Sequence, residues 1–368
     1  MLQRPRGTRD FLPEEMKQRR EIEGILRERV ERFGYGEVVT PTFEHLELFT
    51  MKSGEGIVQE LYAFEDKGGR ALALRPEVTA AVLRMYVNEA RMLAKPLRWY
   101  YLTNCFRYER PQKGRYREFW QFGIEQIGAD SPLADAEVIV VADDLLRGAG
   151  ISFELHVGHL APMKHLLGAV DGTEQRRVMA CLDKRDFAGA KACLAEQGRD
   201  SLAEDLIALA GCRSLPEIFE ISGPIPEQSR IEQMFQYLNA SGVPYVVNFG
   251  IARGLDYYTG MVFEGFAENL GAENQVIGGG SYRLAHLFGG EDVPSCGFAI
   301  GFDRVMVARG GVPLEKPLTV GIVSLGRGRL QAFNAARAFR DAGIRTEVEL
   351  AEKGIGAQLA HASRTADF

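Results

Sequence analysis

The sequence predicts an α+β protein in which helices flank a largely antiparallel sheet. Strand patterns occur on both sides of a helical block, so the block interrupts a single sheet. The strand pairs before the block are joined by short turns, which is how antiparallel strands connect. After Gly310, strands and helices alternate, as in a parallel layer. We therefore expect a sheet domain with a helical insertion, followed by the start of an α/β domain.

The first part of the sheet domain covers residues 1–167. Its helices are predicted from apolar residues at helical spacing, and its strands from β-branched or alternating runs. The expected elements are helices Pro13–Phe33 and Leu133–Leu146, strands Val38–Thr42 and Ser152–His159, and a hairpin Leu61–Glu77 with its turn at Asp66–Gly69.

Residues 168–240 form the predicted helical insertion, because Gly168–Leu238 is rich in Ala, Leu, Glu and Gln with short Gly or Pro breaks. Residues 241–310 complete the sheet domain. There the expected elements are strands Pro244–Phe249, Gly260–Phe266 and Gly297–Ile300, a loop around Gly278–Gly280, and a helix Gly301–Ala308.

A linker at residues 311–317 precedes the last segment, residues 318–368. The alternation predicts strand Leu318–Leu325, helix Leu330–Ala342, strand Arg345–Leu350 and helix Ile355–Ser363. This segment is shorter than a typical domain of about 100 residues. We expect an incomplete α/β domain that is cut at Phe368.

Composition places the chain among ordinary globular proteins, since 46% of its residues are apolar and 26% are charged. It has no apolar run of membrane-spanning length and no secretory signal at its N-terminus, which favours the cytoplasm. Five cysteines without a CxxC pair predict reduced thiols, and six histidines without ligand spacing predict no protein-bound zinc. A net charge of −6 means that any RNA must be bound by local basic patches.

The segment Cys105–Gly128 is predicted to be two strands joined by a basic turn. Side chains alternate between the two faces of a strand, and here the two sets differ in chemistry. The apolar set is Phe106, Tyr108, Trp120, Phe122 and Ile124, and the polar or mixed set is Arg107, Glu109, Phe119, Gln121 and Glu125. The turn carries Arg110, Lys113, Arg115 and Arg117. This pattern indicates a nucleotide-binding hairpin, although a salt-bridged sheet with a basic turn would share the alternation.

The string FRYERPQKGRYREFWQ in this hairpin resembles motif 2 of class II aminoacyl-tRNA synthetases, and its RPQ and GRYREF parts are most similar to histidyl-tRNA synthetases. The resemblance implies that Arg107 holds the ATP α-phosphate and the substrate carboxylate. It also implies that Glu109 contacts adenine, that Phe119 stacks on it, and that Arg115 takes part in ATP binding.

A second string, RGLDYYTG at Arg253–Gly260, is similar to the histidine-specific motif of the same family. Read alone, adjacent tyrosines before a glycine would more simply be a half-buried strand end. The resemblance implies that Glu125 and Tyr258 bind the two imidazole nitrogens and that Tyr257 walls the pocket. It also implies that Arg253 reaches the α-phosphate, so that Arg107 and Arg253 are the catalytic pair.

Three further strings extend the resemblance. By the resemblance, LALRPEVTA supplies Glu77, Val78 and Thr79 to the histidine site, with Glu77 and Thr79 as acceptors for the α-ammonium and Gln121 nearby. SCGFAIGFDRVMVA resembles class II motif 3, which places Arg304 on ATP. The loop with Glu273 reads GGGSYR where the family usually has GGGRYD, so Ser281 and Arg283 depart from the pattern.

The chain is identified as a member of the histidyl-tRNA synthetase family. The resemblance implies a class II synthetase fold, activation of L-histidine with ATP, transfer to tRNA(His), Mg²⁺ arriving with ATP, and a homodimer formed through motif 1, which ends at Pro41. One alternative is the non-catalytic paralogue that acts as the histidine-binding regulatory subunit of ATP phosphoribosyltransferase; another is a synthetase for proline or threonine. By the resemblance, residues 318–368 are the incomplete anticodon-binding domain, which the paralogue lacks. This segment and the complete hairpin favour the synthetase over the paralogue, and Glu125, Tyr257 and Tyr258 favour histidine.

Overall fold

The computed structural model describes residues 2–110, 114–168, 170–183, 186–196, 198–251, 257–268, 270, 274–310, 318–350 and 353–367. Arg253, Glu273 and the predicted linker at residues 311–317 lie outside these ranges. Contacts divide the chain into two compact units, Met1–Gly310 and Gly311–Phe368. The finer division of the first unit into two sheet parts and a helical insertion stays a prediction.

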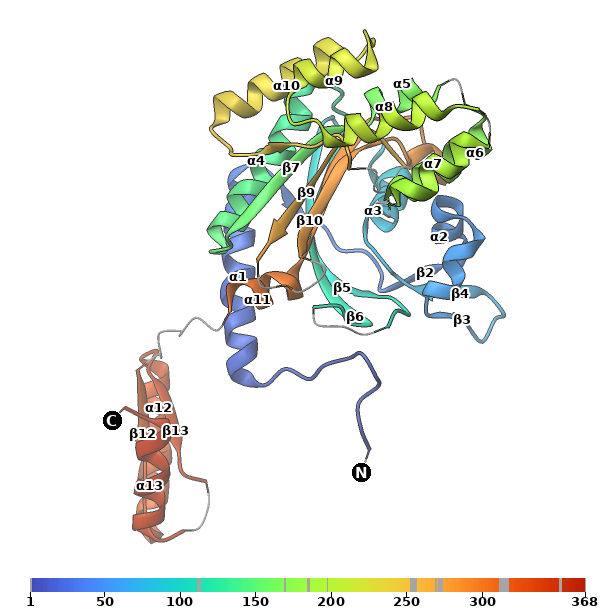
Figure 1. The fold of residues 1–368 in the computed structure, drawn as a ribbon. Coiled ribbons are helices and arrows are strands. Elements are labelled where there is room, and N and C mark those ends of the chain that lie inside the picture. Colours follow the sequence, from blue (N-terminus) through green and yellow to red (C-terminus); the bar gives the residue numbers. More distant parts are fainter. Residues whose placement is uncertain are drawn as a thin grey trace. The chain divides into compact units, whose positions relative to one another are not determined.

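An eight-stranded sheet is the centre of the first unit (Figure 1). Its strands are β1 (Gly36–Glu37), β5 (Leu97–Phe106), β6 (Glu118–Ile127), β7 (Phe153–His159), β8 (Val246–Val247), β9 (Tyr258–Ala267), β10 (Gln275–Tyr282) and β11 (Ser295–Gly301). Their order is β1-β5-β6-β11-β10-β9-β7-β8. The five pairings from β5 to β7 are antiparallel, and the outermost pairs β1–β5 and β7–β8 are parallel. The expected antiparallel sheet flanked by helices is confirmed.

Helices α1 (Pro13–Arg32) and α4 (Pro132–Gly148) cover one face of this sheet (Figure 1). Ile22, Leu26 and Val30 lie one helical turn apart on α1 and are fully buried in the main core, together with Phe122 and Ile124 of β6. Burial of these side chains supplies most of the driving force for the sheet face. The apolar set predicted for β6 therefore faces the core.

The other face carries a smaller layer. It contains α2 (Leu46–Ser53), α3 (Thr79–Met85) and a three-stranded antiparallel sheet of order β2-β4-β3, with β2 (Phe43–His45), β3 (Ala63–Glu65) and β4 (Ala71–Leu74). The predicted hairpin turn is confirmed, because the Gly69 N–H bonds to the Asp66 carbonyl. Figure 1 shows α2 and α3 on the side of the central sheet opposite α1.

Helices fill the chain between β7 and β8, as the composition predicted. They are α5 (Ala161–Leu167), α6 (Gly172–Asp183), α7 (Phe187–Ala195), α8 (Asp200–Gly211), α9 (Leu215–Ser222) and α10 (Gln228–Ser241). The last helix of the unit, α11 (Phe302–Arg309), follows β11 directly. No helix among the described residues is both long and apolar enough to cross a membrane.

The strand expected at Val38–Thr42 was wrong. Pairing with β5 ends when the Val38 N–H bonds to the Tyr100 carbonyl, and Pro41 has no N–H to continue it. The carbonyls of Thr40 and Pro41 instead accept the buried Arg75 guanidinium at 2.8 and 3.1 Å. A side chain thus replaces a neighbouring strand at this point.

The loop expected at Gly278–Gly280 was also wrong, because these glycines lie inside β10 and pair with both β9 and β11. A Cβ on Gly279 would lie 2.5 Å from the Gly297 carbonyl oxygen, and a Cβ on Gly280 would lie 2.8 Å from the Tyr258 ring. The glycines therefore permit a close approach within a strand and do not mark a break.

Two predicted strands have different limits in the structure. The first strand of the hairpin is mostly β5 and ends at Phe106, so Arg107, Tyr108 and Glu109 follow it. The Tyr108 N–H bonds to the Glu60 carbonyl, and its ring is exposed, not buried as the alternation predicted. The strand expected at Pro244–Phe249 is only the two-residue β8.

The second unit contains the predicted strand and helix alternation. Its elements are β12 (Thr319–Ile322), α12 (Arg329–Asp341), β13 (Arg345–Val348) and α13 (Ile355–Thr365). Strands β12 and β13 pair in parallel, which confirms the expected parallel layer.

Candidate active site

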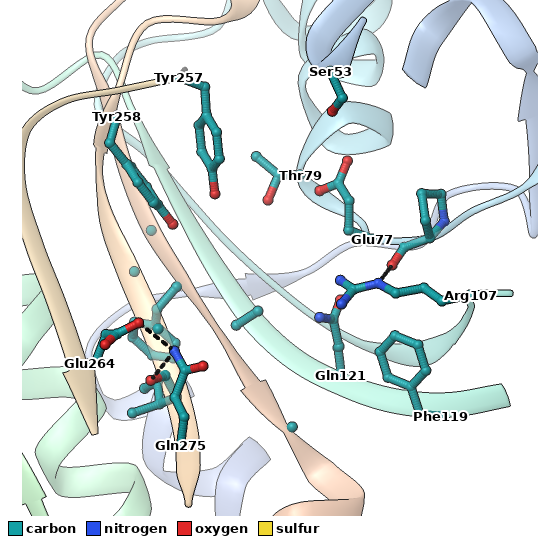
Figure 2. Close-up of a pocket in the computed structure, with 18 of the residues that line it drawn as sticks. Ser53, Glu77, Thr79, Arg107, Phe119, Gln121, Tyr257, Tyr258, Glu264 and Gln275 are labelled. Atoms are coloured by element: carbon teal, nitrogen blue, oxygen red, sulfur yellow. Dashed lines mark hydrogen bonds between the residues drawn. The ribbon is translucent and has the colours of Figure 1, made fainter. Parts of the chain in front are cut away.

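A pocket of about 930 Å³ lies on the face of the central sheet that is not covered by α1 and α4. Strands β6, β9, β10 and β11 form its floor, and α2 and α3 supply one wall. Figure 2 shows Tyr257 and Tyr258 toward one end, Arg107 and Phe119 toward the other, and Thr79, Glu77 and Gln121 between them. We call Glu125, Tyr257, Tyr258 and Tyr282 the aromatic end, and Arg107, Glu109, Arg115, Phe119 and Arg304 the basic end.

Glu125 supplies the carboxyl group of the aromatic end, and only 1% of its surface is exposed. Thr79 donates its hydroxyl to Glu125 Oε1 at 2.7 Å, and Tyr282 donates its hydroxyl to Oε2. Burial raises the pKa of Glu125 to about 8, against the effect of these two hydrogen bonds. A Cβ on Gly297 would lie 2.3 Å from Glu125 Oε2, so a glycine is needed beside this carboxylate.

Tyr257 and Tyr258 form the wall above Glu125. Their ring centroids are 4.1 Å apart, and burial raises the pKa of Tyr257 well above its ordinary value, so its hydroxyl stays protonated. Lys164 of α5 donates to the Tyr258 carbonyl at 2.9 Å and thereby fixes the backbone of this wall. Neutral hydroxyls next to a buried carboxylate suit a small polar ring that has both donor and acceptor atoms.

Glu77 and Gln121 lie between the two ends. Glu77 accepts from the Ala80 N–H at 3.2 Å, which ties it to the first turn of α3. Gln121 Oε1 accepts from the buried Cys105 thiol at 3.3 Å, which orients the amide, and an amide oxygen has a second lone pair for a ligand donor. Acceptors of this kind are what a desolvated ammonium group requires.

Cationic side chains and an aromatic ring make up the basic end. Arg107 donates through Nε to the Pro76 carbonyl at 2.9 Å, and its guanidinium lies 5.1 Å from the Phe119 ring centroid (Figure 2). Glu109 approaches Arg107 and Arg115 at 3.9 and 3.5 Å. A forked guanidinium beside an aromatic face suits a phosphate next to a purine base.

Arg304 enters the basic end from the first turn of α11. It donates to the Gln275 carbonyl of β10. The preceding residue, Asp303, is 2% exposed; it accepts from the Trp120 N–H at 2.7 Å and pairs with Arg19 of α1 at 2.7 Å. Asp303 therefore fixes the start of α11 against β6 and sets the direction from which Arg304 reaches the pocket.

The structure brings nearly all the predicted site residues to this one pocket. Those that line it are Glu77, Thr79, Arg107, Glu109, Arg115, Phe119, Gln121, Glu125, Tyr257, Tyr258 and Arg304. Val78 differs, because its side chain is 1% exposed and packs in a core cluster with Val82, Tyr101 and Cys105. Arg253 lies outside the described residues, and its place stays a prediction.

Several lining residues were not predicted. Lys52, at the end of α2, resembles an ordinary surface lysine in the sequence, and Tyr282 was assigned to a loop. Arg176, Met179 and Ala180 of α6 also line the pocket, so the helical segment contributes to it. The helical spacing of these three residues is present in the sequence. No local pattern shows, however, that this helix face meets a pocket whose other residues are distant in the sequence.

Ser281 and Arg283, where the sequence departs from the family pattern, are held by acidic residues away from the pocket. Ser281 donates to Asp135 at 2.5 Å, and Arg230 of α10 also binds Asp135, at 2.8 Å. Arg283 pairs with Asp130 at 2.6 Å. The two positions thus join β10 to the α4 side of the sheet and do not contribute to the lining.

An antiparallel sheet that carries an arginine hairpin, a glycine-lined floor and an arginine at the start of the following helix defines a class II aminoacyl-tRNA synthetase. The family model for histidyl-tRNA synthetase matches residues 7–305. The chain belongs to the histidyl-tRNA synthetase family, and it is an aminoacyl-tRNA ligase.

Curated relatives support this placement over the whole chain. The sequence is 64% identical to a histidine–tRNA ligase of Methanoculleus marisnigri and 66% identical to one of Methanoregula boonei; each alignment covers 100% of this chain and 90% of the relative.

Solved structures agree with the fold. The apo histidyl-tRNA synthetase of S. aureus aligns with a TM-score of 0.72 at 29% identity, covering 99% of this chain and 88% of that one. A Bacillus halodurans protein described as an ATP phosphoribosyltransferase regulatory subunit/histidyl-tRNA synthetase aligns with a TM-score of 0.84 at 26% identity, covering 98% and 96%. The last description spans both the synthetase and the regulatory alternative, whereas the relatives above 60% identity are histidine–tRNA ligases.

Proposed function

We propose that this pocket activates L-histidine with ATP to form histidyl-adenylate and pyrophosphate, and that the histidyl group is then transferred to tRNA(His). The observation that carries the proposal is the buried carboxylate of Glu125, placed among three tyrosines at one end of a pocket whose other end is cationic. An apolar amino acid would leave this carboxylate without a ligand partner, which is costly when the group is desolvated.

The aromatic end selects the imidazole. A neutral imidazole has one N–H donor and one acceptor nitrogen. In the proposed complex, the N–H donates to Glu125 and the other nitrogen accepts from the Tyr258 hydroxyl, while Tyr257 covers the ring. A site built from buried hydrogen-bonding groups rejects ligands without matching atoms more strongly than an apolar pocket rejects a missing methylene.

The middle of the pocket holds the amino acid backbone. Glu77, Thr79 and Gln121 accept from the α-ammonium, and Val78 contributes through its main chain between the first two. The carboxylate of histidine lies toward Arg107, so the ligand spans from Glu125 to the basic end. Ion pairing at both backbone groups fixes the carboxylate oxygen that must react.

The basic end binds ATP. Phe119 stacks on adenine, Glu109 accepts from its amino group, and Arg115 and Arg304 bind the β- and γ-phosphates. Arg107 bridges the α-phosphate and the histidine carboxylate. The half-exposed arginines suit a polyanion that enters and leaves in each turnover.

The first step is attack of a histidine carboxylate oxygen on the α-phosphorus. The new oxygen–phosphorus bond forms as the bond to pyrophosphate breaks, and pyrophosphate leaves with the electron pair. Negative charge gathers on the non-bridging oxygens, and Arg107 and Arg253 stabilise it from two sides. In the second step a hydroxyl of the terminal tRNA ribose attacks the histidyl carbonyl carbon. The bond between this carbon and the phosphate oxygen breaks, and AMP leaves with the electron pair.

Three further features belong to the proposal. Mg²⁺ enters with ATP, bound to phosphate oxygens, as it usually does in ATP-dependent enzymes. The protein acts as a homodimer in the cytoplasm. Val39, inside the segment that resembles motif 1, is 78% exposed, and Phe43, just after it, is 52% exposed; both are apolar surface available to a second copy.

Histidine-dependent exchange of labelled pyrophosphate into ATP tests the function directly. Exchange should require L-histidine and should not occur with proline or threonine. Charging of tRNA(His) then tests the second step. Histidine binding without any exchange would contradict the proposal and would favour a regulatory histidine-binding role.

A further inference from the structure

Lys52 is a nearly buried cation inside the candidate active site. Its side chain retains 9% exposure, and its Nζ lies 3.3 Å from Glu77 Oε1. The same ammonium lies over the Tyr257 ring, 4.5 Å from the centroid. Lys52 therefore contacts a residue of the proposed ammonium site and a residue of the proposed imidazole wall.

An ordinary lysine in the last turn of a helix extends into solvent and complements the helix dipole there. Lys52 does lie in the last turn of α2, but its side chain lines the pocket, whereas the neighbouring Met51 is 47% exposed. Burying an ammonium costs free energy unless a carboxylate and a ring face compensate it. The contacts with Glu77 and Tyr257 supply both, so this inward position is a stable one.

The two oxygens of Glu77 have different surroundings. Oε1 receives both the Lys52 ammonium and the Ala80 N–H, the latter at 3.2 Å. Among the residues that the structure describes, no hydrogen bond or ion pair to Oε2 is recorded. Two donors on one oxygen fix the carboxylate plane and leave the second oxygen for a ligand.

We propose that Lys52 is a positioning residue for amino acid binding, which holds Glu77 so that its second oxygen receives the α-ammonium of histidine. The inference rests on the proposed function and adds a residue to it. Glu77 then lies between two cations, its own lysine and the ligand.

This arrangement makes the effect of Lys52 on binding depend on the α-ammonium of the ligand. A ligand without an α-ammonium leaves one oxygen of Glu77 unpaired, and it gains nothing from the orientation that Lys52 imposes. Removing the lysine charge should therefore harm histidine more than its deamino analogue, imidazolepropionate. General loosening of the pocket would weaken both ligands equally.

The test compares Lys52→Met, which keeps the length and apolar stem, with Lys52→Arg, which keeps the charge. Lys95→Met is the matched control, because Lys95 also pairs with a glutamate, Glu291 at 3.8 Å, and lies over a ring, Tyr86 at 5.6 Å, but does not line the pocket. Each variant is assayed by pyrophosphate exchange, with imidazolepropionate as a competitive inhibitor and thermal unfolding as the check of folding.

Lys52→Met should raise the KM for histidine about tenfold, with the KM for ATP and the inhibition constant of imidazolepropionate changed less than about twofold. Lys52→Arg should restore most of the histidine affinity, and Lys95→Met should match the wild type. Unchanged or tighter histidine binding in folded Lys52→Met, or an equal loss for both ligands, would overturn the inference. A wild-type protein without histidine-dependent exchange would instead overturn the proposed function.

Discussion

The two ends of the pocket differ in burial and in charge, and we expect them to recognise their proposed ligands by opposite physical means. At the aromatic end, Glu125 is 1% exposed and is hydrogen-bonded by neutral hydroxyls. At the basic end, the side chains of Arg107, Glu109 and Arg115 keep 29 to 37% of their surface exposed, and they pair with one another at 3.5 to 3.9 Å. The aromatic end is thus built around one buried carboxyl group, and the basic end around several partly exposed charges.

The difference assigns separate tasks to the two ends. A desolvated carboxylate makes discrimination sharp, because an unmatched ligand leaves it unpaired. Exposed, mutually paired charges discriminate poorly but can exchange partners readily, which suits a phosphate chain that must be held, stabilised and released. Mutations at the aromatic end should therefore alter the KM for histidine, and mutations at the basic end should alter the rate or the KM for ATP.

Arg107→Ala should give the largest effect, because it removes a charge that is proposed to stabilise the transition state. Loss of one such preorganised donor costs about 10²- to 10³-fold in rate, so kcat in pyrophosphate exchange should fall by that factor. Arg107→Lys should be intermediate, since it keeps the charge but loses the forked donor. Arg98→Ala is the matched control, because Arg98 lies on β5, pairs with Glu137 at 3.1 Å and does not line this pocket. A folded Arg107→Ala enzyme with near-normal kcat would show that Arg107 does not stabilise the transition state.

Glu125→Gln should be next, and it should act on histidine alone. The amide keeps the shape and can still bond with Thr79 and Tyr282, but it loses the charged acceptor for the imidazole N–H. Because a hydrogen bond to a charged group contributes about 1.5–3 kcal/mol, the KM for histidine should rise roughly 10- to 100-fold. The KM for ATP should stay within about twofold of the wild type. An equal rise in both constants would mean that the two ends are not separate.

The same carboxylate should give histidine binding a characteristic pH dependence. Burial raises the pKa of Glu125 to about 8, so in the empty pocket the group is largely protonated at neutral pH. Accepting the imidazole N–H requires the ionised form, so binding releases a proton below that pKa. The KM for histidine should therefore fall as the pH rises from about 7 to about 8.5, a range in which free imidazole is mostly neutral. Glu125→Gln should abolish this step, and persistence of the step in the variant would assign it to another group.

The local patterns of the sequence predicted most elements that position the site. Alternation in β6 correctly placed Phe122 and Ile124 in the core and Gln121 and Glu125 in the pocket, because the period of two belongs to the strand itself. Alternation failed at Tyr108, where a hydrogen bond to Glu60 takes the chain out of the sheet. No local pattern contains that contact between distant segments.

The same limit explains the missed residues. Lys52 acquires its role only when α2 packs beside Glu77, and the glycine run in β10 resembles a loop until Tyr258 and Gly297 are placed next to it. Arg75 resembles any arginine before a proline in the sequence. In the structure its guanidinium donates to the Thr40 and Pro41 carbonyls, which a neighbouring strand would otherwise have bonded. Sequence patterns therefore predicted the elements and the motif residues, whereas tertiary contacts determined which other side chains complete the pocket.

Phe119→Leu should give the smallest effect and should be confined to the nucleotide. Leucine keeps an apolar side chain under the Arg107 guanidinium but removes the ring face on which adenine is proposed to stack. Because an aromatic pair contributes about 0.5–1.5 kcal/mol beyond its buried area, the KM for ATP should rise about two- to tenfold. Phe119 follows the basic turn by a few residues and lies on the same strand as Glu125, so a distortion of β6 would also raise the KM for histidine. Measuring both constants in pyrophosphate exchange separates these cases: a change in the KM for ATP alone supports stacking at the basic end, and a matching rise for histidine would show that the two ends are mechanically linked through β6.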